Sequence, residues 1–327
     1  MKSIVFFNNK GGVGKTTLLY HLAWMFSEMG KTVVVADLDP QANLTSMFLP
    51  EEELEELWDP DNEKHQSIMS ALRPIVRGLG DITPAPIRTL TPRLHLIPGD
   101  LELSNFESNL SEAWGKCLDR QEPAFRATSA FHRVVRNAAA NLNADIILLD
   151  VGPNFGAINR AALIASDHVV VPLAPDLFSI QGLRNLGPTL AKWRDEWEDR
   201  KNRNPAKDLP LPPGAMVPAG YVVLQFGIRD SRPVKAYEKW SRRIPSTFND
   251  FVLNRNDQPS LSYGDDSHCL GLLKHYRSLM PLAMEARKPI FHLKPADGAI
   301  GAHTYAVKDC GDDFRSLADN ILRNTGG

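Results

Sequence analysis

The chain has 327 residues, of which 43% are hydrophobic and 23% charged, and its formal net charge at pH 7 is −2. This length can hold one large α/β domain with insertions, and the near-zero charge gives no overall attraction to DNA or to an acidic membrane. Either kind of binding would therefore need a local basic patch.

Three cysteines, Cys117, Cys269 and Cys310, lie far apart in the sequence and form no C-x-x-C pair, which favours free thiols in the cytosol. The apolar run after Met1 is too short for a signal peptide, and no run approaches the roughly 18 apolar residues of a membrane span. We expect a soluble, cytoplasmic protein that does not bind membranes.

A glycine-rich loop joins a short apolar strand, residues 3–8, to a helix that apolar spacing predicts over residues 18–29. Glycines let backbone N–H groups point at a phosphate, and the helix N-terminus adds partial positive charge. We expect Lys15 to reach the β- and γ-phosphates of ATP and the Thr16 hydroxyl to bind Mg²⁺. The predicted nucleotide-binding residues of the loop are Lys10, Gly11, Gly12, Val13, Gly14, Lys15, Thr16 and Thr17.

The start of this loop departs from the general phosphate-binding pattern, because Asn9 stands where the first glycine belongs and Lys10 follows it. The run Lys-Gly-Gly-Val-Gly-Lys-Thr-Thr resembles the deviant Walker A loop of the ParA/MinD family of P-loop ATPases, whose signature is the early lysine. The resemblance implies a doubly wound, mostly parallel sheet flanked by helices, and a homodimer that sandwiches two ATP molecules. It also implies that Lys10 acts in trans on the partner's phosphates, while Lys15 acts in cis.

A second buried strand, residues 32–37, ends in the run Asp-Leu-Asp-Pro-Gln. An acidic strand end close to a phosphate-binding loop can handle a metal or an attacking water. By resemblance to ParA-type ATPases, Asp39 orients or activates the hydrolytic water and Asp37 helps to hold the water shell of Mg²⁺. The alternative is that both carboxylates only cap a turn.

Residues 50–92 are less regular. They contain the acidic run 51–57, an amphipathic helix candidate at 67–78 and several prolines between 82 and 92 that indicate loop. The acidic run suits a solvated helix face or, alternatively, a partner-docking surface.

A strand at residues 94–97 and helices at 109–117 and 124–141 lead to the strongest buried strand, residues 146–150. This strand ends in Asp150, a Walker B position whose carboxylate would bind Mg²⁺ through water. Where the family has a first proline after this strand, the chain has Gly152 before Pro153, which leaves the conformation of that loop open.

A strand at 168–172 precedes residues 172–183, which resemble the family segment that borders the dimer face. A long polar helix, about 180–201, then gives way to a proline-rich loop at 202–218 and a strand at 221–225. We predict that the strand-end residue Gln225 and the region 274–278 lie near the adenine of the bound nucleotide.

The composition turns basic between residues 228 and 251. If this stretch is a helix, its cations share one side and could meet DNA phosphates without reading sequence; an ordinary charged surface is the alternative. The candidate DNA-binding residues are Arg229, Arg232, Lys235, Lys239, Arg242 and Arg243.

The C-terminal stretches 285–290, 298–299 and 312–322 again resemble the family, and the last helix suits core packing better than membrane binding. We expect a single P-loop ATPase domain over residues 1–327, with insertions at 50–92, 202–218 and 227–275.

The resemblance favours a ParA-like ATPase that converts ATP to ADP and phosphate slowly, with ATP and Mg²⁺ bound and a ParB-like or other partner accelerating turnover. Such a protein would dimerise on ATP, bind DNA non-specifically, associate with the nucleoid, and partition a plasmid or chromosome or position another cargo. A MinD-like positioning switch, a regulator acting through a protein partner, and an ATP-dependent small-molecule enzyme remain alternatives. An iron–sulfur reductase would need suitably placed cysteines, which are not evident here.

Overall fold

The computed structural model describes residues 1–59, 66–226, 228–229, 232–233, 240, 242–255, 263–276 and 278–326. For residues 225, 226, 228, 229, 232 and 233 it describes the backbone alone.

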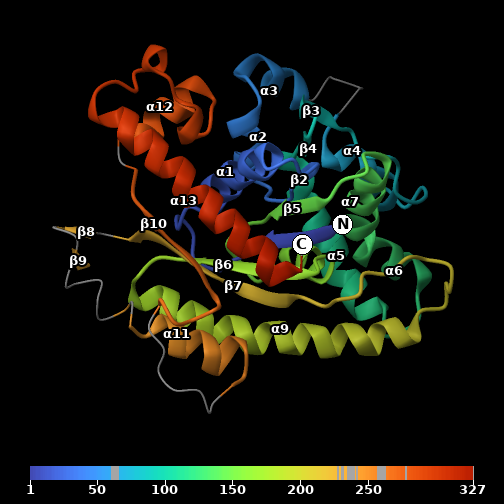
Figure 1. Ribbon diagram of the computed structural model, residues 1–327. Coiled ribbons are helices and arrows are strands. Elements are labelled where there is room, and N and C mark those ends of the chain that lie inside the picture. Colours follow the sequence, from blue (N-terminus) through green and yellow to red (C-terminus); the bar gives the residue numbers. More distant parts are fainter. Residues whose placement is uncertain are drawn as a thin grey trace.

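Among the described residues, eight strands form one sheet in the order β10-β7-β6-β1-β5-β2-β4-β3 (Figure 1). Every neighbouring pair is parallel except β3 and β4. The strands are β1 (Lys2–Phe6), β2 (Val33–Asp37), β3 (Arg88–Thr91), β4 (Leu94–Ile97), β5 (Ile146–Asp150), β6 (His168–Leu173), β7 (Val217–Phe226) and β10 (Cys269–Lys274). A separate antiparallel pair consists of β8 (Ile228–Arg229) and β9 (Arg232–Pro233).

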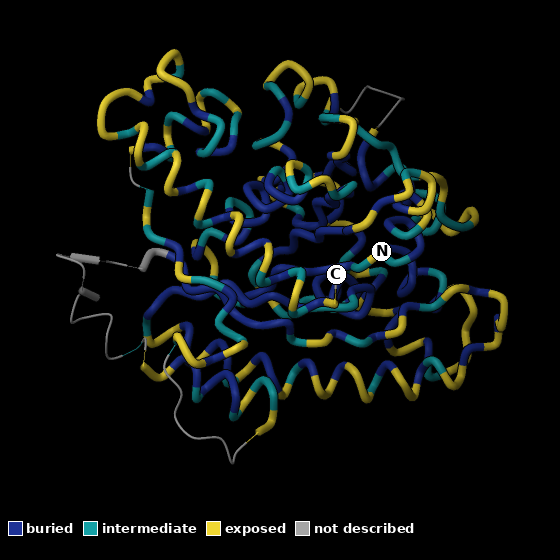
Figure 2. Tube along the Cα trace, in the orientation of Figure 1, coloured by how far each residue is buried: buried dark blue, intermediate teal, exposed yellow. Residues whose placement is uncertain are grey.

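Helices cover both faces of the sheet, and the side chains of the central strands alternate between two apolar cores. Val5 and Phe7 face one core, whereas Ile4 and Phe6 face the other. Because both faces are covered, β2 and β5 are buried along their whole length, and the tube in Figure 2 is dark blue in the middle of the sheet.

The first core is covered by α4 (Ile68–Val76), α5 (Ser104–Lys116), α6 (Glu122–Thr128), α7 (Ala130–Asn141), α8 (Ala157–Ile164), α9 (Leu177–Arg203), α11 (Ile244–Thr247) and the π-helical turn η2 (Phe248–Val252). The second core is covered by α1 (Lys15–Glu28), α2 (Asn43–Phe48), α3 (Glu51–Leu57), α12 (Leu279–Ala286) and α13 (Ala302–Thr325). Short 3-10 turns are η1 (Leu101–Leu103), η3 (Ile290–His292) and η4 (Pro295–Asp297). No helix in the described ranges is long and apolar enough to cross a membrane.

The predicted fold class, a doubly wound and mostly parallel α/β sheet, is confirmed. One detail differs from expectation, since the helix predicted over 124–141 is divided at Ser129 into α6 and α7. Within the stretch 227–275, β10 pairs with β7 at the edge of the main sheet. The division of the chain into one domain with insertions stays a prediction.

Candidate nucleotide-binding site

The predicted phosphate-binding loop and the two strand-end carboxylates, Asp37 and Asp150, meet at the carboxyl ends of the three central strands. The glycine-rich loop follows β1, Asp37 ends β2 and Asp150 ends β5. In the strand register, Asp150 is the partner of both Phe6 and Asp37, so these three ends are level with one another. Ligands of open α/β sheets bind at this kind of edge.

The backbone of the loop needs glycine at two positions. Gly12 and Gly14 have φ angles of 72° and 88°, in the left-handed region that residues with a Cβ rarely adopt. The turn at Gly14 leads directly into α1, which begins at Lys15, and so aims the helix N-terminus at the loop.

Lys15 is only 7% exposed and lines the cavity above the sheet. Burial lowers the pKa of its ammonium group, while the negative charges of Asp150 and Asp39 oppose that shift. A cation that is already buried near two carboxylates can neutralise a bound phosphate without a further desolvation cost when the phosphate arrives.

Thr16 and Asp150 form a pair that suits a magnesium ion. The Thr16 hydroxyl donates to Oδ2 of Asp150 at 2.9 Å, whereas Oδ1 is buried without a hydrogen-bond partner among the described residues. Burial, and next the charge of Asp37, raise the pKa of Asp150 well above its usual range. An orphaned buried carboxylate oxygen beside a hydroxyl fits a cation with oxygen ligands.

In the described part of the chain, no three His, Cys, Asp or Glu side chains cluster closely enough to hold a metal ion by themselves. A magnesium ion here would depend on Thr16, Asp150 and phosphate oxygens, which is how Mg²⁺ commonly binds with nucleotides.

Asp37 is completely buried and turned toward the start of α2. Its Oδ2 accepts from the backbone N–H of Thr45 at 2.8 Å and from the Thr45 hydroxyl at 2.7 Å, and its Oδ1 accepts from the N–H of Asp39 at 3.2 Å. Burial raises the pKa of Asp37 to about 6. These contacts position Asp39 and α2, and the role of Asp37 in a magnesium water shell stays a prediction.

Asp39 lies on the wall of the cavity, where its Oδ1 accepts from the N–H of Gln41 at 3.0 Å. A Cβ at position 152 would lie 3.4 Å from the same oxygen. A side chain at position 152 would thus be in van der Waals contact with the Asp39 carboxylate.

Lys10 has much more exposed surroundings than Lys15. Its ammonium group pairs with Asp176 of the same chain and lies 5.6 Å from the ring centroid of Phe178, a side chain that is 70% exposed. In the structure of the single chain, Lys10 thus contacts the N-terminus of α9. Its predicted contact with a partner's phosphates is not tested by one chain.

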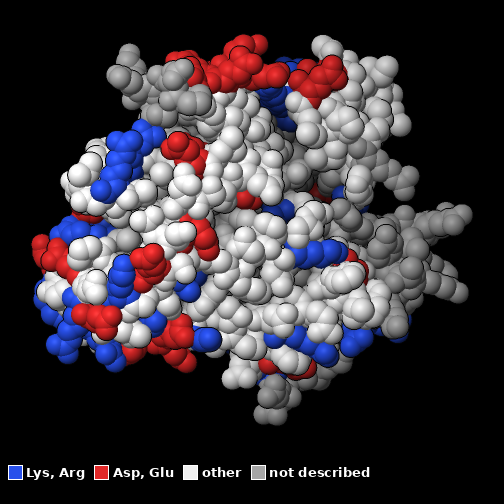
Figure 3. Space-filling model, turned by 180° about the vertical axis from the view of Figure 1, so that it is seen from behind, with Lys and Arg blue, Asp and Glu red and all other residues white. Residues whose placement is uncertain are grey.

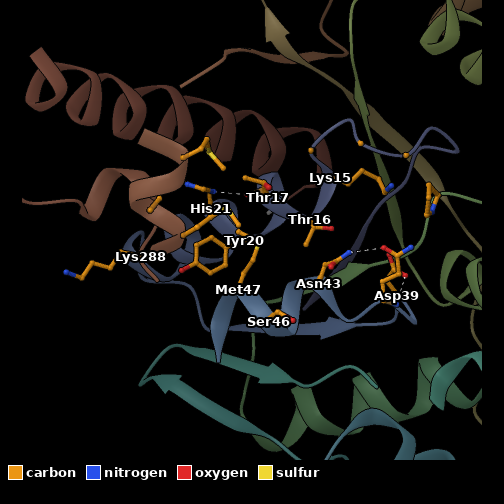
Figure 4. Close-up of a pocket in the computed structure, with 18 residues that line it drawn as sticks. Lys15, Thr16, Thr17, Tyr20, His21, Asp39, Asn43, Ser46, Met47 and Lys288 are labelled. Carbon is orange, nitrogen blue, oxygen red and sulfur yellow. Dashed lines mark hydrogen bonds between the residues drawn. The ribbon is translucent and has the colours of Figure 1, made fainter. Parts of the chain in front are cut away.

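Two adjoining cavities meet at the loop. The larger, of about 610 Å³, extends from Lys15 and Asp39 along α1 toward α12, and Figure 4 shows Lys288 at its far end. The smaller, of about 160 Å³, is lined by residues of the loop and by apolar side chains. Its lining is Val13, Gly14, Thr17, Leu18, His21, Leu224, Leu273, Lys274, His275, Tyr276, Met280, Ile290 and Phe314.

This second cavity includes part of the predicted region 274–278, whereas the side chain of Gln225 lies outside the described residues. The sequence reasoning missed the walls formed by α12 and by His21. The contact with α12 depends on how the chain folds back, so no local pattern signals it. His21, however, lies four residues after Thr17, and this spacing places both on one helix face.

The candidate DNA-binding residues do not lie on one helix. Arg229 and Arg232 are paired in the β8–β9 ladder with side chains that are not described, and Lys235 and Lys239 lie outside the described residues. Arg242 and Arg243 are exposed in the turn before α11. The condition of one helix is therefore not met at the beginning of the stretch, where residues 228–229 and 232–233 pair as antiparallel strands.

The distribution of charge over the molecule is uneven. On the face seen from behind, acidic side chains gather along the top; Lys and Arg side chains lie at the lower right, on the side of α11, and also at the lower left, where they are mixed with Asp and Glu (Figure 3). DNA binding is not tested by this arrangement.

Sequence comparison finds relatives for the N-terminal part of the chain. A family model described as AAA domain (AAA_31) matches residues 1–203. Protein IncC of Escherichia coli is 35% identical over 196 residues, which cover 60% of this chain and 47% of IncC. Chromosome partitioning protein ParA of Caulobacter vibrioides is 26% identical over 193 residues, or 59% of this chain and 63% of ParA. The match thus spans about half of IncC and less than two thirds of ParA.

Solved structures resemble the whole chain. Protein DIP2308 from Corynebacterium diphtheriae gives a TM-score of 0.73 at 25% identity, covering 99% of this chain and 98% of that protein. The ATP complex of an McdA variant from Cyanothece gives a TM-score of 0.65 at 14% identity, covering 100% and 96%, a likeness of fold alone. Since the family model covers more than half of the 327 residues, the chain belongs to the AAA_31 family of ParA/MinD-type P-loop ATPases.

Proposed function

We propose that this protein is an ATP-dependent dimerisation switch that partitions DNA or positions another cargo. One observation carries the proposal: two lysines of one loop have opposite surroundings. Lys15 is buried beside two carboxylates, whereas Lys10 is about one third exposed and lies beside the exposed ring of Phe178. The first suits the phosphates of its own protomer, and the second can reach those of another protomer.

The nucleotide would lie across both cavities, with its phosphates at the loop and its base in the smaller, largely apolar one. Thr16 and Asp150 would hold Mg²⁺, which supplies charge neutralisation at the phosphate oxygens. Asp39, at the cavity wall, would orient the attacking water. Lys15 in cis and Lys10 of the partner protomer would stabilise the charge that develops on the transferred phosphoryl group.

The relatives support this proposal. One of them is a chromosome partitioning protein by name, and the McdA structure was solved with ATP. By analogy, the homodimer would form when ATP is bound and separate after hydrolysis, and a ParB-like or other partner would accelerate that step. Exposed Arg242 and Arg243 would contribute to non-specific DNA binding in the cytoplasm, at the nucleoid.

The decisive experiment compares molecular mass in solution, with and without ATP and Mg²⁺, for the native protein and two variants. Asp39→Ala should accumulate as an ATP-bound dimer, because it binds but does not hydrolyse ATP. Lys15→Ala should remain a monomer and lose nucleotide binding. If the native protein and Asp39→Ala both stay monomeric at saturating ATP, the switch proposal is wrong.

A second measurement separates DNA from other surfaces. The proposal expects a DNA mobility shift that requires ATP and weakens as salt rises. No shift at low salt, together with an intact ATP dimer, would favour an ATPase that acts through a protein partner. ATP-dependent binding to liposomes would instead favour the MinD-like alternative.

A further inference from the structure

His21 is a buried histidine at the junction of the two cavities, and the proposed chemistry gives it no part. It lies on α1, one turn after Thr17, and is 1% exposed. Its ring lines both the larger and the smaller cavity, next to the P-loop (Figure 4).

Both ring nitrogens of His21 have backbone partners. Nδ1 lies 2.8 Å from the carbonyl oxygen of Thr17, and the backbone N–H of Ile290 donates to Nε2 at 3.1 Å. Since Nε2 accepts, the proton must be on Nδ1, which donates to Thr17. Burial lowers the pKa of His21 to about 4, so this neutral tautomer persists at neutral pH.

These contacts join segments from the two ends of the chain. Ile290 begins η3, which directly follows the segment after α12, and the His21 ring also stacks on Phe314 of α13 with centroids 4.9 Å apart. Ile290 and Phe314 are themselves lining residues of the smaller cavity. His21 therefore fixes the distance between the helix that carries the P-loop and the C-terminal wall of that cavity.

The two halves of the site depend on His21 unequally. The phosphate cradle is formed by the glycine loop, Lys15 and Thr16, which precede His21 on the chain. The Thr16 hydroxyl donates to Asp150, and the charge of Asp150 acts on Lys15. The wall of the smaller cavity, by contrast, is attached to α1 at His21 by the bond from Ile290 and the stack on Phe314. Further along α1, His292 of η3 also contacts Glu28 and the ring of Trp24, away from the two cavities. Loss of His21 should loosen the wall and leave the cradle in place.

We infer that His21 is a positioning residue for the nucleobase, which holds the C-terminal wall of the base cavity against the phosphate-binding helix. The inference rests on the proposed ATP site. His21 does not touch the reacting phosphate, and its effect is on how well a base-bearing ligand binds compared with a ligand that has phosphates alone.

The test uses two probes, Mg²⁺-ATP and Mg²⁺-tripolyphosphate, whose affinities are measured by calorimetry on the full-length protein. His21→Leu leaves the Ile290 N–H without its acceptor and should weaken ATP binding about tenfold or more. Tripolyphosphate binding should change by less than about twofold, since it does not use the base cavity. In hydrolysis assays, KM for ATP should rise while kcat stays close to that of the native protein.

Two further variants keep the test sharp. In His21→Gln the amide supplies one donor and one acceptor, and ATP affinity should largely recover. Phe314→Leu removes the ring stack but keeps the apolar contact, and it provides an independent reading if His21→Leu does not fold. The matched control is His132→Leu on α7. His132 is partly buried, and its Nδ1 lies 3.4 Å from the backbone carbonyl oxygen of Ala165, but the residue lines neither cavity. It should leave both affinities unchanged.

Equal losses of ATP and tripolyphosphate affinity in His21→Leu would mean general damage to the site and would overturn the inference. So would unchanged ATP affinity in both His21→Leu and Phe314→Leu. A native protein that binds tripolyphosphate but not ATP, or neither, contradicts the proposed function itself, and this result is read before any variant is made.

Discussion

The ammonium group of Lys10 pairs with the carboxylate of Asp176 in the same chain. Asp176 also caps α9, because its Oδ1 accepts a hydrogen bond from the N–H of Ser179 at 2.8 Å. The two side chains of the ion pair are 31% and 34% exposed, so the pair contributes about 1 kcal/mol or less. If Lys10 acts on a partner's phosphates, it must exchange this carboxylate for them, and the exchange is energetically easy.

Asp176→Asn should therefore favour the ATP-bound dimer. The amide keeps an oxygen for the α9 cap but removes the charge that competes for Lys10, and the dimer should form up to about fivefold more tightly. Sedimentation in saturating ATP measures the dissociation constant. Asp176→Ala, which also loses the cap, serves for comparison. A dimer weakened equally in both variants would show that Asp176 is needed at the interface itself.

Asp150→Asn should have opposite effects on stability and activity. The carboxylate is fully buried, one of its oxygens has no partner among the described residues, and Asp37 is its neighbour in register. An amide of the same shape removes the buried charge and still accepts from Thr16. The nucleotide-free variant should be more stable at neutral pH, while magnesium-dependent hydrolysis should fall by at least about a hundredfold. A variant that hydrolyses ATP normally would contradict the assignment of Asp150.

The pH dependence of that stabilisation gives a separate prediction. The pKa of Asp150 is raised in the folded protein, so between its usual value and the raised one the folded state holds a proton that the unfolded state has lost. Stability contributed by this group is present at low pH and is lost as pH rises. The advantage of Asp150→Asn should therefore be small near pH 4 and grow toward pH 7, as measured by denaturant unfolding. Buried histidines with a lowered pKa make stability rise with pH, which is the opposite trend. They are present in both proteins, so their contribution cancels in the difference in unfolding free energy.

The sequence predicted those parts of the fold and site that are specified by neighbouring residues, and it missed those that depend on contacts between distant residues. The strands that end at Asp37 and Asp150 are uninterrupted apolar runs, and the glycines of the loop specify its backbone, so the sheet edge and the cradle were predictable. β10 was not, because its half-buried sequence contains Gly271 and has no regular period. Part of the smaller cavity's wall was predicted, because region 274–278 was named from the sequence. The contact of His21 with Ile290 was missed, because the two residues are 269 apart and no local pattern encodes their contact.

Gly182→Ala should weaken nucleotide binding from outside the cavity. A Cβ at Gly182 on α9 would lie 2.8 Å from Oδ1 of Asn9, the residue that opens the loop. Neighbouring Asn8 cannot easily make room, since its amide donates to the carbonyl of Pro172 at 2.7 Å and its Oδ1 accepts from the N–H of Lys10 at 3.0 Å. Since Oδ1 of Asn9 is the end of a side chain that can turn away, we expect a loss of only about 1 kcal/mol in stability, and a several-fold weaker affinity for ATP because the start of the loop shifts.

Gly115→Ala is the matched control for that substitution. Gly115 is also in a helix, α5, but a Cβ there meets no atom within 4 Å. This variant should be more stable by about 0.5–1 kcal/mol and bind ATP normally. Thermal unfolding and ATP titration measure both proteins. If Gly182→Ala behaves like Gly115→Ala, the close approach of α9 to the loop has no bearing on nucleotide binding.

The role of the basic turn before α11 can be measured through salt dependence. Arg242 and Arg243 are exposed there, and the guanidinium of Arg243 lies 5.4 Å from the ring centroid of Trp240. If each arginine neutralises one DNA phosphate, the double variant Arg242→Ala/Arg243→Ala should lower the slope of log K against log salt by about 1.8. Lys116→Ala/Arg120→Ala removes two exposed cations at and just after the end of α5 and should leave the slope unchanged. An unchanged slope in the first variant, with DNA still bound, would place the phosphate contacts elsewhere and remove this turn from the proposed interface.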